Sequence, residues 1–381
     1  MWHILFMPLS FPINDDAVRL LKRLDTLAGR QVRLLLTLDD ARRDAIHRQA
    51  RISTIGATTR IENAVLTDAQ VDWIDTELCT DGRPTAFAAR REFLQSKLSK
   101  DRERSLEEVA GCREMLALIY SEGPDLFPLT EATLRGLHHE LLKYYAPASH
   151  HLGRYKLVTN SVVERDGGTG KERTVLKTSD PGTMTEIAMR DLIAWYNETL
   201  PDHPWPVAVA TEFVFRFLAC HPFQDGNGRL GRALFLLALL QSSDTDLRQV
   251  VPFLAIDRFI EKRRPEYYAV LARTGRAYNQ DSTKYDLPLF LRFMSKVTGE
   301  ALDVISFYVE REESIRGLPE AAHAVLKCFK ERPEQRLAPR DIRVLTRLPS
   351  RTATRVLATL LDHGLLQRYG SGAGTRYQLV F

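Results

Sequence analysis

The stretch His221-Pro222-Phe223-Gln224-Asp225-Gly226-Asn227-Gly228-Arg229-Leu230-Gly231-Arg232 decides the fold around it. Apolar, helix-like sequence lies on both sides, from Val207 to Leu218 and from Ala233 to Leu240. Gly226 and Gly228 interrupt that pattern only briefly. We therefore predict a helix, a tight loop and a second helix, with the glycines at the start of the second helix.

The residue types in this stretch are those of a phosphate site. A helix N-terminus presents free backbone N–H groups and the positive end of the helix dipole, which suit a phosphate. Arg229 and Arg232 are three residues apart and share one face of the second helix. Asp225 is a hard oxygen ligand suited to Mg²⁺, and His221 can accept a proton near neutral pH. The stretch therefore predicts a magnesium-nucleotide site beside a general base.

The same stretch resembles the signature of the Fic family, His-Pro-Phe-x-Asp-Gly-Asn-Gly-Arg-x-x-Arg, at every fixed position. The resemblance implies a mostly α-helical fold, a Fic helical bundle with a β-hairpin flap. It implies an enzyme that uses ATP and Mg²⁺ and most often moves AMP to a Tyr, Thr or Ser hydroxyl of a target protein. The residues that it implies for nucleotide binding are Phe223, Gly226, Asn227, Gly228, Arg229, Gly231 and Arg232.

The roles expected within the stretch follow from phosphoryl-transfer chemistry, which depends mainly on positioning and charge neutralisation. Backbone N–H groups near Gly226 would hold the α- and β-phosphates, while Asn227 adds an amide donor. Arg229 would contact the β-phosphate and Arg232 the γ-phosphate. Asp225 would hold Mg²⁺ and His221 would deprotonate the target hydroxyl. Phe223 is expected to anchor the loop in the core, and Gln224 to be structural.

An upstream segment is similar to the family's autoinhibitory motif, Ser/Thr-x-x-x-Glu-Gly/Asn, through Thr58, Glu62 and Asn63. Its position before the core resembles the subclass with an N-terminal inhibitory helix. The resemblance implies that the Glu62 carboxylate competes with the γ-phosphate for Arg232, and we expect a bidentate pair. The pattern also fits an ordinary helix C-terminus with Asn63 as a left-handed cap.

The region from Gly153 to Ser179 is the one clear β-hairpin pattern. The residues expected to face each other across the turn at 166–170 are Tyr155, Leu157, Val162 and Val163 on one side and Val175 and Leu176 on the other. In Fic proteins such a flap clamps the target polypeptide by strand addition. The resemblance therefore implies that Val175 and Leu176 contribute to target binding.

Further along the chain, Tyr267 and Tyr268 match a paired-tyrosine feature that lies near the adenine in several family members. The family often places an asparagine a few residues later, where this chain has Gly275, with Asn279 beyond it. Adjacent tyrosines are also common in helix packing.

The segment His138-His139-Glu140 lacks the further histidine of a zinc-protease pattern, so structural histidines are expected there.

Residues 318–381 read as a separate unit. Eleven Lys/Arg against five Asp/Glu give residues 319–381 a net charge of +6. We expect helices over 320–330, 339–345 and 349–363, then strands over 365–369 and 375–380. This order is similar to the winged-helix fold, and its recognition helix would carry Ser350, Arg351, Thr352, Thr354 and Arg355. DNA binding and protein contact, including homodimer formation, are both open for this unit.

Composition agrees with a chain of several globular domains. The 381 residues are 44% hydrophobic and 27% charged, with a net charge of +4. We predict an N-terminal helical region over 1–110, a catalytic core over 111–300 and the winged-helix-like unit over 318–381. Four separated cysteines suggest reduced core thiols in a cytoplasmic protein. The longest apolar run, 233–240, is far shorter than the roughly 20 residues of a membrane span, so no membrane association is expected.

Three other functions share the same residues. Glu62 could instead position water in an enzyme that removes AMP from its target. A nucleotide-sensing, DNA-binding regulator would account for the C-terminal unit but has no need of a general base. Transfer of UMP or phosphate in place of AMP is the third.

Overall fold

The computed structural model describes residues 9–80, 83–98, 102–165, 172–275 and 285–380. Most of this chain is helical, with only short two-stranded antiparallel sheets among the described residues, which confirms the predicted mostly α class. Two compact units can be distinguished. Unit 1 comprises Met1–Ala64 and Glu107–Ser306, and unit 2 comprises Val65–Leu106 and Phe307–Phe381.

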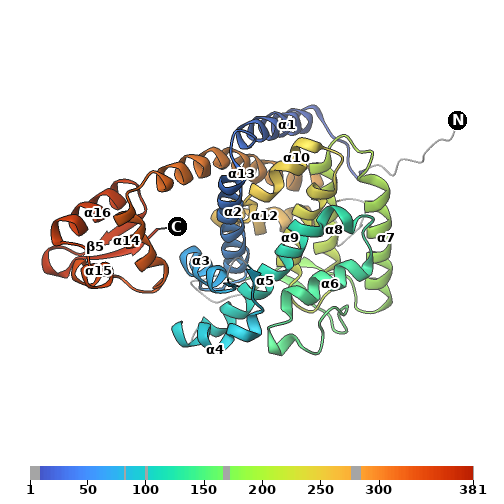
Figure 1. The fold of residues 1–381 in the computed structure, drawn as a ribbon. Coiled ribbons are helices and arrows are strands. Elements are labelled where there is room, and N and C mark those ends of the chain that lie inside the picture. The colour runs from blue at the N-terminus through green and yellow to red at the C-terminus, as the bar shows by residue number, and fades with distance from the viewer. Residues whose placement is uncertain (1–8, 81–82, 99–101, 166–171, 276–284, 381) are drawn as a thin grey trace. The chain divides into compact units, whose positions relative to one another are not determined.

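The described residues of unit 1 form mostly helices (Figure 1) and one β-hairpin. Its elements are α1 (Asp15–Leu35), α2 (Asp40–Ile61), most of α5 (Glu103–Glu122), η2 (Gly123–Leu126), α6 (Glu131–Leu142), η3 (Ala146–Ala148), β3 (Ser161–Arg165), β4 (Glu172–Lys177), α7 (Thr183–Thr199), α8 (Pro206–Cys220), α9 (Asn227–Gln241), α10 (Thr245–Val250), η4 (Val251–Phe253), α11 (Ile256–Lys262), α12 (Arg264–Gly275) and most of α13 (Leu287–Arg316).

Helices α8 and α9 form the centre of unit 1, where they pack side by side (Figure 1). All of α8 except Arg216 is buried, and α9 is buried except for Gly228 and Gln241. A helix buried on every side carries apolar residues all round, which explains the uninterrupted apolar runs on both sides of the His221–Arg232 stretch. The loop between these helices is thereby held by the core of the unit.

The hairpin differs from the prediction at its first strand. β3 begins at Ser161, and β3 and β4 pair antiparallel with Val162 opposite Leu176. Tyr155 instead forms a bridge with Phe223, and Leu157 is 87% exposed, so the expectation that these two residues face β4 was wrong. The reason is tertiary: the backbone N–H of Lys156 donates to Pro222 O at 2.8 Å, so this segment pairs with the loop after α8. Residues 166–171, where the turn was predicted, lie outside the described residues.

Unit 2 contains α3 (Asp68–Glu77), β1 (Cys79–Thr80), β2 (Arg83–Pro84), α4 (Phe87–Lys97), α14 (Glu320–Lys330), α15 (Pro339–Thr346), α16 (Ser350–Asp362), β5 (Leu366–Tyr369), η5 (Gly372–Gly374) and β6 (Arg376–Leu379). The three helices and two strands predicted after residue 318 are all present, with ends shifted by at most two residues. The grouping of residues 65–106 with this segment was not predicted from the sequence.

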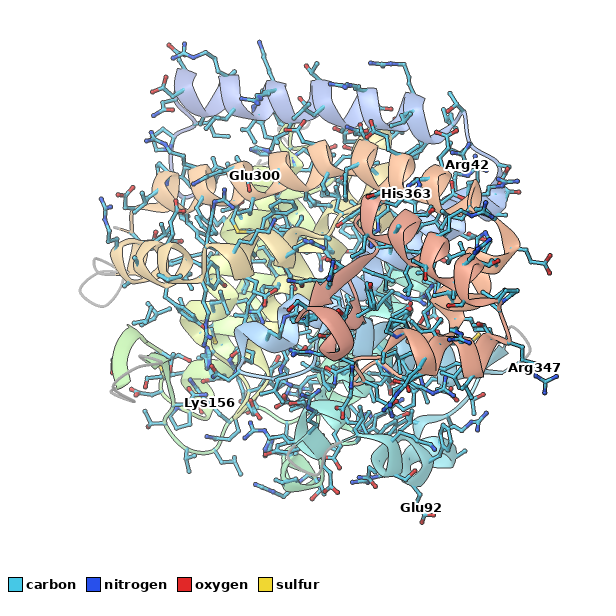
Figure 2. All side chains as sticks on the ribbon, turned by 90° about the vertical axis from the view of Figure 1, so that its left-hand side faces the viewer. Arg42, Glu92, Lys156, Glu300, Arg347 and His363 are labelled. Carbon is cyan, nitrogen blue, oxygen red and sulfur yellow. The ribbon has the colours of Figure 1, made fainter. Side chains whose placement is uncertain are left out.

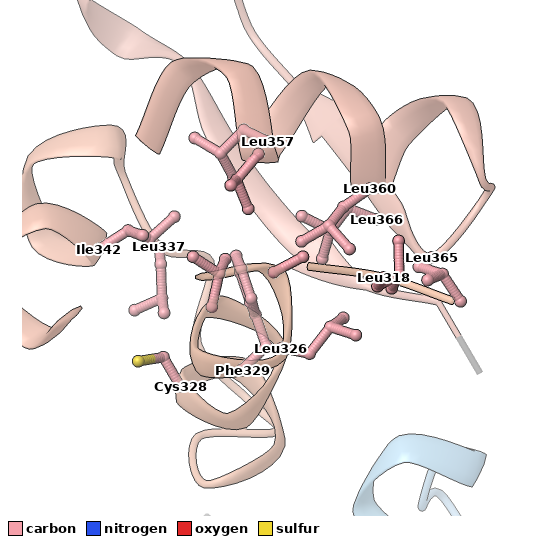
Figure 3. Close-up of a cluster of buried hydrophobic side chains, with 13 residues drawn as sticks. Leu318, Leu326, Cys328, Phe329, Leu337, Ile342, Leu357, Leu360, Leu365 and Leu366 are labelled. Atoms are coloured by element: carbon pink, nitrogen blue, oxygen red, sulfur yellow. The ribbon is translucent and has the colours of Figure 1, made fainter. Parts of the chain in front are cut away.

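A compact apolar core holds the C-terminal part of unit 2 together (Figure 3). Phe329 from α14, Ile342 from α15 and Leu360 from α16 are each at most 1% exposed. Leu337 precedes α15 and exchanges two backbone hydrogen bonds of 2.9 Å with Tyr377 of β6. The three helices and the β5–β6 hairpin are therefore fixed on one core.

The fold also bears on the predictions about the cysteines and about membrane-spanning segments. Cys112, Cys220 and Cys328 are buried, but Cys79 is exposed at the start of β1, so the prediction of four core thiols was wrong for Cys79. Among the described residues, no helix has both the length and the apolar character needed to cross a bilayer.

Candidate active site

A cavity in unit 1 brings the central stretch together with segments far from it in sequence. The residues that line this cavity are Glu62, Ser161, Leu218, His221, Gln224, Asp225, Gly226, Asn227, Gly228, Arg229, Arg232, Tyr267, Tyr268 and Leu271. Most of the predicted site residues are among them. Phe223, Gly231, Thr58, Asn63, Val175 and Leu176 are not, and the role or position of each is described below.

The loop between α8 and α9 has the geometry that the glycines predicted. His221 ends α8 in a left-handed conformation, with φ of 52°, and its N–H donates to Phe217 O at 2.8 Å. Gly226 precedes α9 with φ of +78°, which favours glycine, and a Cβ there would lie 3.2 Å from Leu141. Gly231 packs against α8, where a Cβ would lie 3.1 Å from Leu218. It therefore supports helix packing rather than lining the cavity.

Phe223 and Asn227 fix the loop from within. The Phe223 ring is fully buried and stacks on His138, with ring centroids 3.9 Å apart. The Asn227 side chain accepts from the Phe223 N–H at 2.9 Å and donates to Phe223 O at 2.7 Å. Both ends of that amide therefore hold the loop, whereas the sequence suggested an amide donor to the nucleotide. The backbone N–H of Asn227 still belongs to the first turn of α9.

His138 acts as a structural residue, as expected. Its Nδ1 accepts from the Gly153 N–H at 3.0 Å, so its Nε2 carries the proton that is donated to Asp225 O at 3.1 Å. Burial lowers the pKa of this imidazole to about 4, which keeps it neutral at physiological pH. His138 therefore positions the backbone of the loop at Asp225.

The His221 imidazole is held in the tautomer that a general base needs. Its Nδ1 lies 3.3 Å from Leu218 O, a carbonyl that can only accept, so Nδ1 bears the proton and Nε2 has a free lone pair. Burial lowers the pKa of His221 to about 4, and the positive charge of Lys156 acts in the same direction. The imidazole is therefore neutral and ready to accept a proton at pH 7.

Asp225 and Arg229 provide opposite charges at the entrance to α9. Asp225 Oδ1 accepts from the Gly226 N–H at 2.6 Å and from Arg229 Nη2 at 3.4 Å. The Arg229 side chain is 3% exposed, and its Nη1 lies 3.7 Å from Glu108 Oε1. Arg229 Nε and Nη1 are nevertheless buried without a hydrogen bond. Buried donors without acceptors are costly, and an anionic ligand in the cavity would relieve that cost.

The residues present fit a magnesium-bound polyphosphate. The first N–H groups of α9 lack intrahelical partners and point out of the helix N-terminus. Asp225 Oδ2 has no protein partner among the described residues, which contain no group of three or more potential metal ligands. Mg²⁺ is commonly held by one or two carboxylates together with phosphate oxygens. A single Asp225 carboxylate suits that mode of binding.

Arg232 is held by the end of α2. Its Nε donates to Thr58 Oγ1, and its Nη2 donates both to Thr58 O and to Glu62 Oε1, each at 2.9 Å. Asp257 Oδ2 lies 3.7 Å from Nε. The predicted bidentate Glu62–Arg232 pair is therefore wrong in detail. Glu62 makes one contact because Thr58 takes the Nε donor and shares Nη2.

Glu62 also lies against the start of α9. A Cβ on Gly228 would lie 2.3 Å from Glu62 Oε1, so the Glu62 side chain would have to move away. Gly228 is thus needed for the carboxylate to approach the helix N-terminus. Asn63 follows with φ of 71°, so the segment is both a partner of Arg232 and a helix end with a left-handed cap.

Two further contacts attach the end of α2 to the core. Arg60 makes two hydrogen bonds to Glu261, at 2.6 and 2.9 Å. Arg264 Nη2 donates to Asn63 Oδ1 at 2.9 Å. Neither pair carries a sequence pattern that would have revealed it, because the partners are about 200 residues apart.

The two predicted tyrosines and the two predicted flap residues have different surroundings. Tyr267 and Tyr268 both line the cavity, with ring centroids 5.4 Å apart, and burial raises the pKa of both phenols. Val175 and Leu176 are 6% and 1% exposed, and Leu176 packs against Gly275 of α12. Their side chains therefore face the protein. Asn279 lies outside the described residues.

Sequence reasoning missed Lys156 and the polar network beneath the loop. The Lys156 side chain is fully buried, and its Nζ donates to Asn160 Oδ1, Thr178 Oγ1 and Cys220 O at 2.9 to 3.1 Å. Asn160 Nδ2 donates in turn to Phe223 O at 2.8 Å. Burial lowers the pKa of Lys156 to about 8. The only sign of Lys156 in the sequence was its position near the start of the predicted hairpin region, which begins at Gly153.

Comparison with known proteins gives a consistent result. Residues 128–239 match the model of the Fic/DOC family. A Fido domain-containing protein from Dictyostelium discoideum is 34% identical over 98 residues, which cover 23% of this chain and 68% of that protein.

Solved structures with similar folds come from several organisms. A Fic family protein from Desulfovibrio desulfuricans G20 has a TM-score of 0.57 at 22% identity and covers 97% of this chain and 98% of its own. A Fic domain containing signaling protein from Bacteroides thetaiotaomicron VPI-5482 has a TM-score of 0.56 at 21% identity, over 76% of this chain and 97% of its own. For Fic-1 (aa134–508) from C. elegans the TM-score is 0.55 at 19% identity, over 79% of this chain and 74% of that one. At these identities the likeness concerns the fold.

Proposed function

The chain belongs to the Fic/Fido domain family, whose members commonly transfer AMP to proteins, and we propose that it is a protein adenylyltransferase restrained by Glu62. Its donor would be ATP and its acceptor a Tyr, Thr or Ser hydroxyl, on a target protein or on the chain itself. The observation that carries the proposal is that a neutral His221 with a free Nε2 shares one cavity with the unbonded donors of Arg229.

Binding of ATP would use groups that have no strong protein partner in the resting state. The α- and β-phosphates would lie on the N–H groups at the start of α9, with Arg229 Nε and Nη1 donating to their oxygens. Asp225 would hold Mg²⁺, which supplies charge neutralisation for the phosphates when bound. Tyr267 and Tyr268 line the same cavity and would pack beside the base.

In the proposed reaction, His221 Nε2 accepts the proton of the target hydroxyl. The hydroxyl oxygen then forms a bond to the α-phosphorus, and the bond from that phosphorus to the bridging oxygen of pyrophosphate breaks. The products are the adenylylated side chain and pyrophosphate, with the proton on the imidazolium. A nucleotide sensor would have no use for an imidazole kept neutral by burial and oriented by Leu218 O.

Restraint by Glu62 would follow from competition for Arg232. Glu62 Oε1 occupies a donor of Arg232 and lies against Gly228, which is the space that a γ-phosphate needs to reach that arginine. With the γ-phosphate displaced, the α-phosphate would not be aligned with His221. The Arg232 side chain is 2% exposed, so water cannot replace a lost partner, and competition between Glu62 and the γ-phosphate for this guanidinium would be strong.

The test is the incorporation of label from ATP labelled separately at the α- and γ-positions, followed by mass spectrometry of the modified residue. Glu62→Gly should increase α-label incorporation into the chain and its targets by at least about tenfold. Glu122→Gly is the matched control, because Glu122 is the exposed last residue of α5. Adding His221→Ala to Glu62→Gly should reduce the rate by about 10²- to 10⁴-fold.

Other outcomes identify other activities. γ-Label on protein would mean phosphate transfer, and competition by unlabelled UTP would point to UMP transfer. If Glu62→Gly loses the ability to release AMP from a previously modified target, Glu62 serves hydrolysis. Unchanged α-label incorporation in Glu62→Gly would contradict the inhibitory role.

A further inference from the structure

Unit 2 contains a segment in which nearly all charge is of one sign. Between residues 336 and 376 the acidic residues are only Asp341 and Asp362, and there is no lysine. The arginines of this segment are Arg336, Arg340, Arg343, Arg347, Arg351, Arg355, Arg368 and Arg376. Guanidinium groups in such numbers suit phosphate recognition, because their planar donors match phosphate oxygens.

Most of these guanidinium groups have no ionic partner. Five of the arginines are exposed and form no ion pair with any described carboxylate: Arg343, Arg347, Arg351, Arg355 and Arg368. Two lysines of α14, by contrast, lie near carboxylates. Lys327 lies 3.9 Å from Glu331, and Lys330 lies 3.9 Å from Asp72. These five exposed arginines without an ion pair all lie between residues 343 and 368.

The backbone arranges these arginines on a helix–turn–helix. α15 ends at Thr346, the turn is Arg347-Leu348-Pro349 and α16 begins at Ser350. Arg347 has φ of 57°, which reverses the chain between the helices, and its side chain projects outward (Figure 2). The inner faces of both helices are buried in the apolar core, through residues such as Ile342 and Leu357 (Figure 3).

The outer face of α16 is the exposed one. Arg351, Thr354, Arg355 and Ala358 are all exposed, while Ala353, Val356 and Leu357 between them are buried. The first turn of α16 contains no acidic residue that would repel a phosphate. Beside it, the β5–β6 hairpin carries Arg368, and Arg336 stacks on the Tyr369 ring at 3.8 Å. A rigid helix with a basic outer face and a basic hairpin is the geometry of a major-groove reader.

We propose that unit 2 binds duplex DNA through the turn and the first two turns of α16. Arg347, Arg351 and Arg355 would contact phosphates at the groove. Charge complementarity favours DNA over a protein partner. Val344 and Leu345 on α15 are 78% and 39% exposed and would suit a protein partner. They form a small apolar surface, whereas the five exposed arginines without an ion pair form a larger basic one. This inference is independent of the proposed transfer reaction.

The test uses the full-length protein and fluorescence anisotropy with a duplex pool of random sequence, about three helical turns long, over a series of salt concentrations. We expect binding at about 50 mM salt that weakens steeply as salt rises. The double variant Arg351→Ala/Arg355→Ala should bind at least about tenfold more weakly at about 0.1 M salt. The slope of log K against log salt should become shallower by about one for each arginine that no longer reaches a phosphate.

The matched control is Lys22→Ala/Lys327→Ala, which removes the same charge from exposed positions on α1 and α14 and should bind like the parent. Equal weakening by the control would show that binding follows net charge and not this helix face. Failure of the parent to bind any duplex at low salt would overturn the proposal. Self-association abolished by Val344→Ser, without DNA binding, would assign the face to a protein partner instead.

Discussion

Gly228 and Glu62 are coupled at the level of single atoms. The glycine leaves space for the Glu62 carboxylate, since a Cβ would be 2.3 Å from Oε1 and 3.3 Å from Arg232 Nη1. The family signature requires glycine here, and the sequence alone suggested only a backbone that approaches phosphate. In the resting protein the same space holds a carboxylate. Under the proposed function, the glycine would serve the restrained state as well as nucleotide binding.

We expect Gly228→Ala to destabilise the resting protein by displacing Glu62 from Arg232. Arg232 keeps its Thr58 hydrogen bonds and the nearby Asp257, so the loss of the Glu62 contact should cost about 1–3 kcal/mol. The same substitution in a Glu62→Gly background should cost clearly less, because the clashing carboxylate is absent. Thermal unfolding of the four proteins measures this coupling. Equal losses in both backgrounds would show that the clash does not involve Glu62.

A second residue-scale prediction concerns the protonation of His221. Burial and the Lys156 charge lower the pKa of this imidazole to about 4. A lowered pKa keeps the base neutral as the pH falls from about 7.5 to about 5.5, and protonation disables it only on approach to a pH of about 4. Histidine-selective NMR, with His221→Ala to assign the signal, should find it neutral at about pH 6. A midpoint above about pH 6 would contradict the described burial.

At the scale of elements, the base of the β3–β4 hairpin and the loop between α8 and α9 are one hydrogen-bonded assembly. Lys156, Asn160 and Thr178 come from the segments flanking the hairpin, and they bond to one another and to the backbone of residues 220–223. Ser179 Oγ adds a bond to Cys220 O at 2.8 Å. The position of the hairpin is thereby linked to that of His221.

We expect Lys156→Met to loosen the loop without touching the nucleotide groups. The substitution removes three hydrogen bonds of a fully buried ammonium, which should lower the free energy of unfolding by about 1–3 kcal/mol. In the Glu62→Gly background, kcat for transfer should fall at least about tenfold while the KM for ATP changes little, because His221 is displaced. Lys22→Met, on the exposed face of α1, is the control. A change confined to KM would contradict a positioning role.

At the scale of the whole molecule, the two units combine segments that are distant in sequence. Residues 65–106 belong with the C-terminal helices, and the unit boundaries fall inside α5 and α13. The fold likeness to the Desulfovibrio desulfuricans protein extends over 97% of this chain, so it includes elements of both units. One unit carries the candidate transfer site, and the other carries the arginine-rich helix–turn–helix.

What the sequence determined by itself is local. The apolar runs around His221–Arg232 predicted two helices, Gly226 predicted the turn, and the elements after residue 318 followed from periodicity and glycine positions. The family resemblance also identified Glu62 and Arg232 as partners. Apart from that pair, these features depend on neighbouring residues and on backbone conformation, which sequence patterns report directly.

Only the tertiary structure decided which distant groups meet. Tyr155 is not part of the hairpin strand, because its segment pairs with the loop at Phe223. Glu62 makes a single contact with Arg232, and no bidentate pair, because Thr58 accepts a hydrogen bond from the Arg232 Nε. Lys156 and Asp257 reach the site from segments that carry no motif. Contacts of this kind depend on how buried surfaces pack, and a single lysine or aspartate in the sequence carries no sign of its partner.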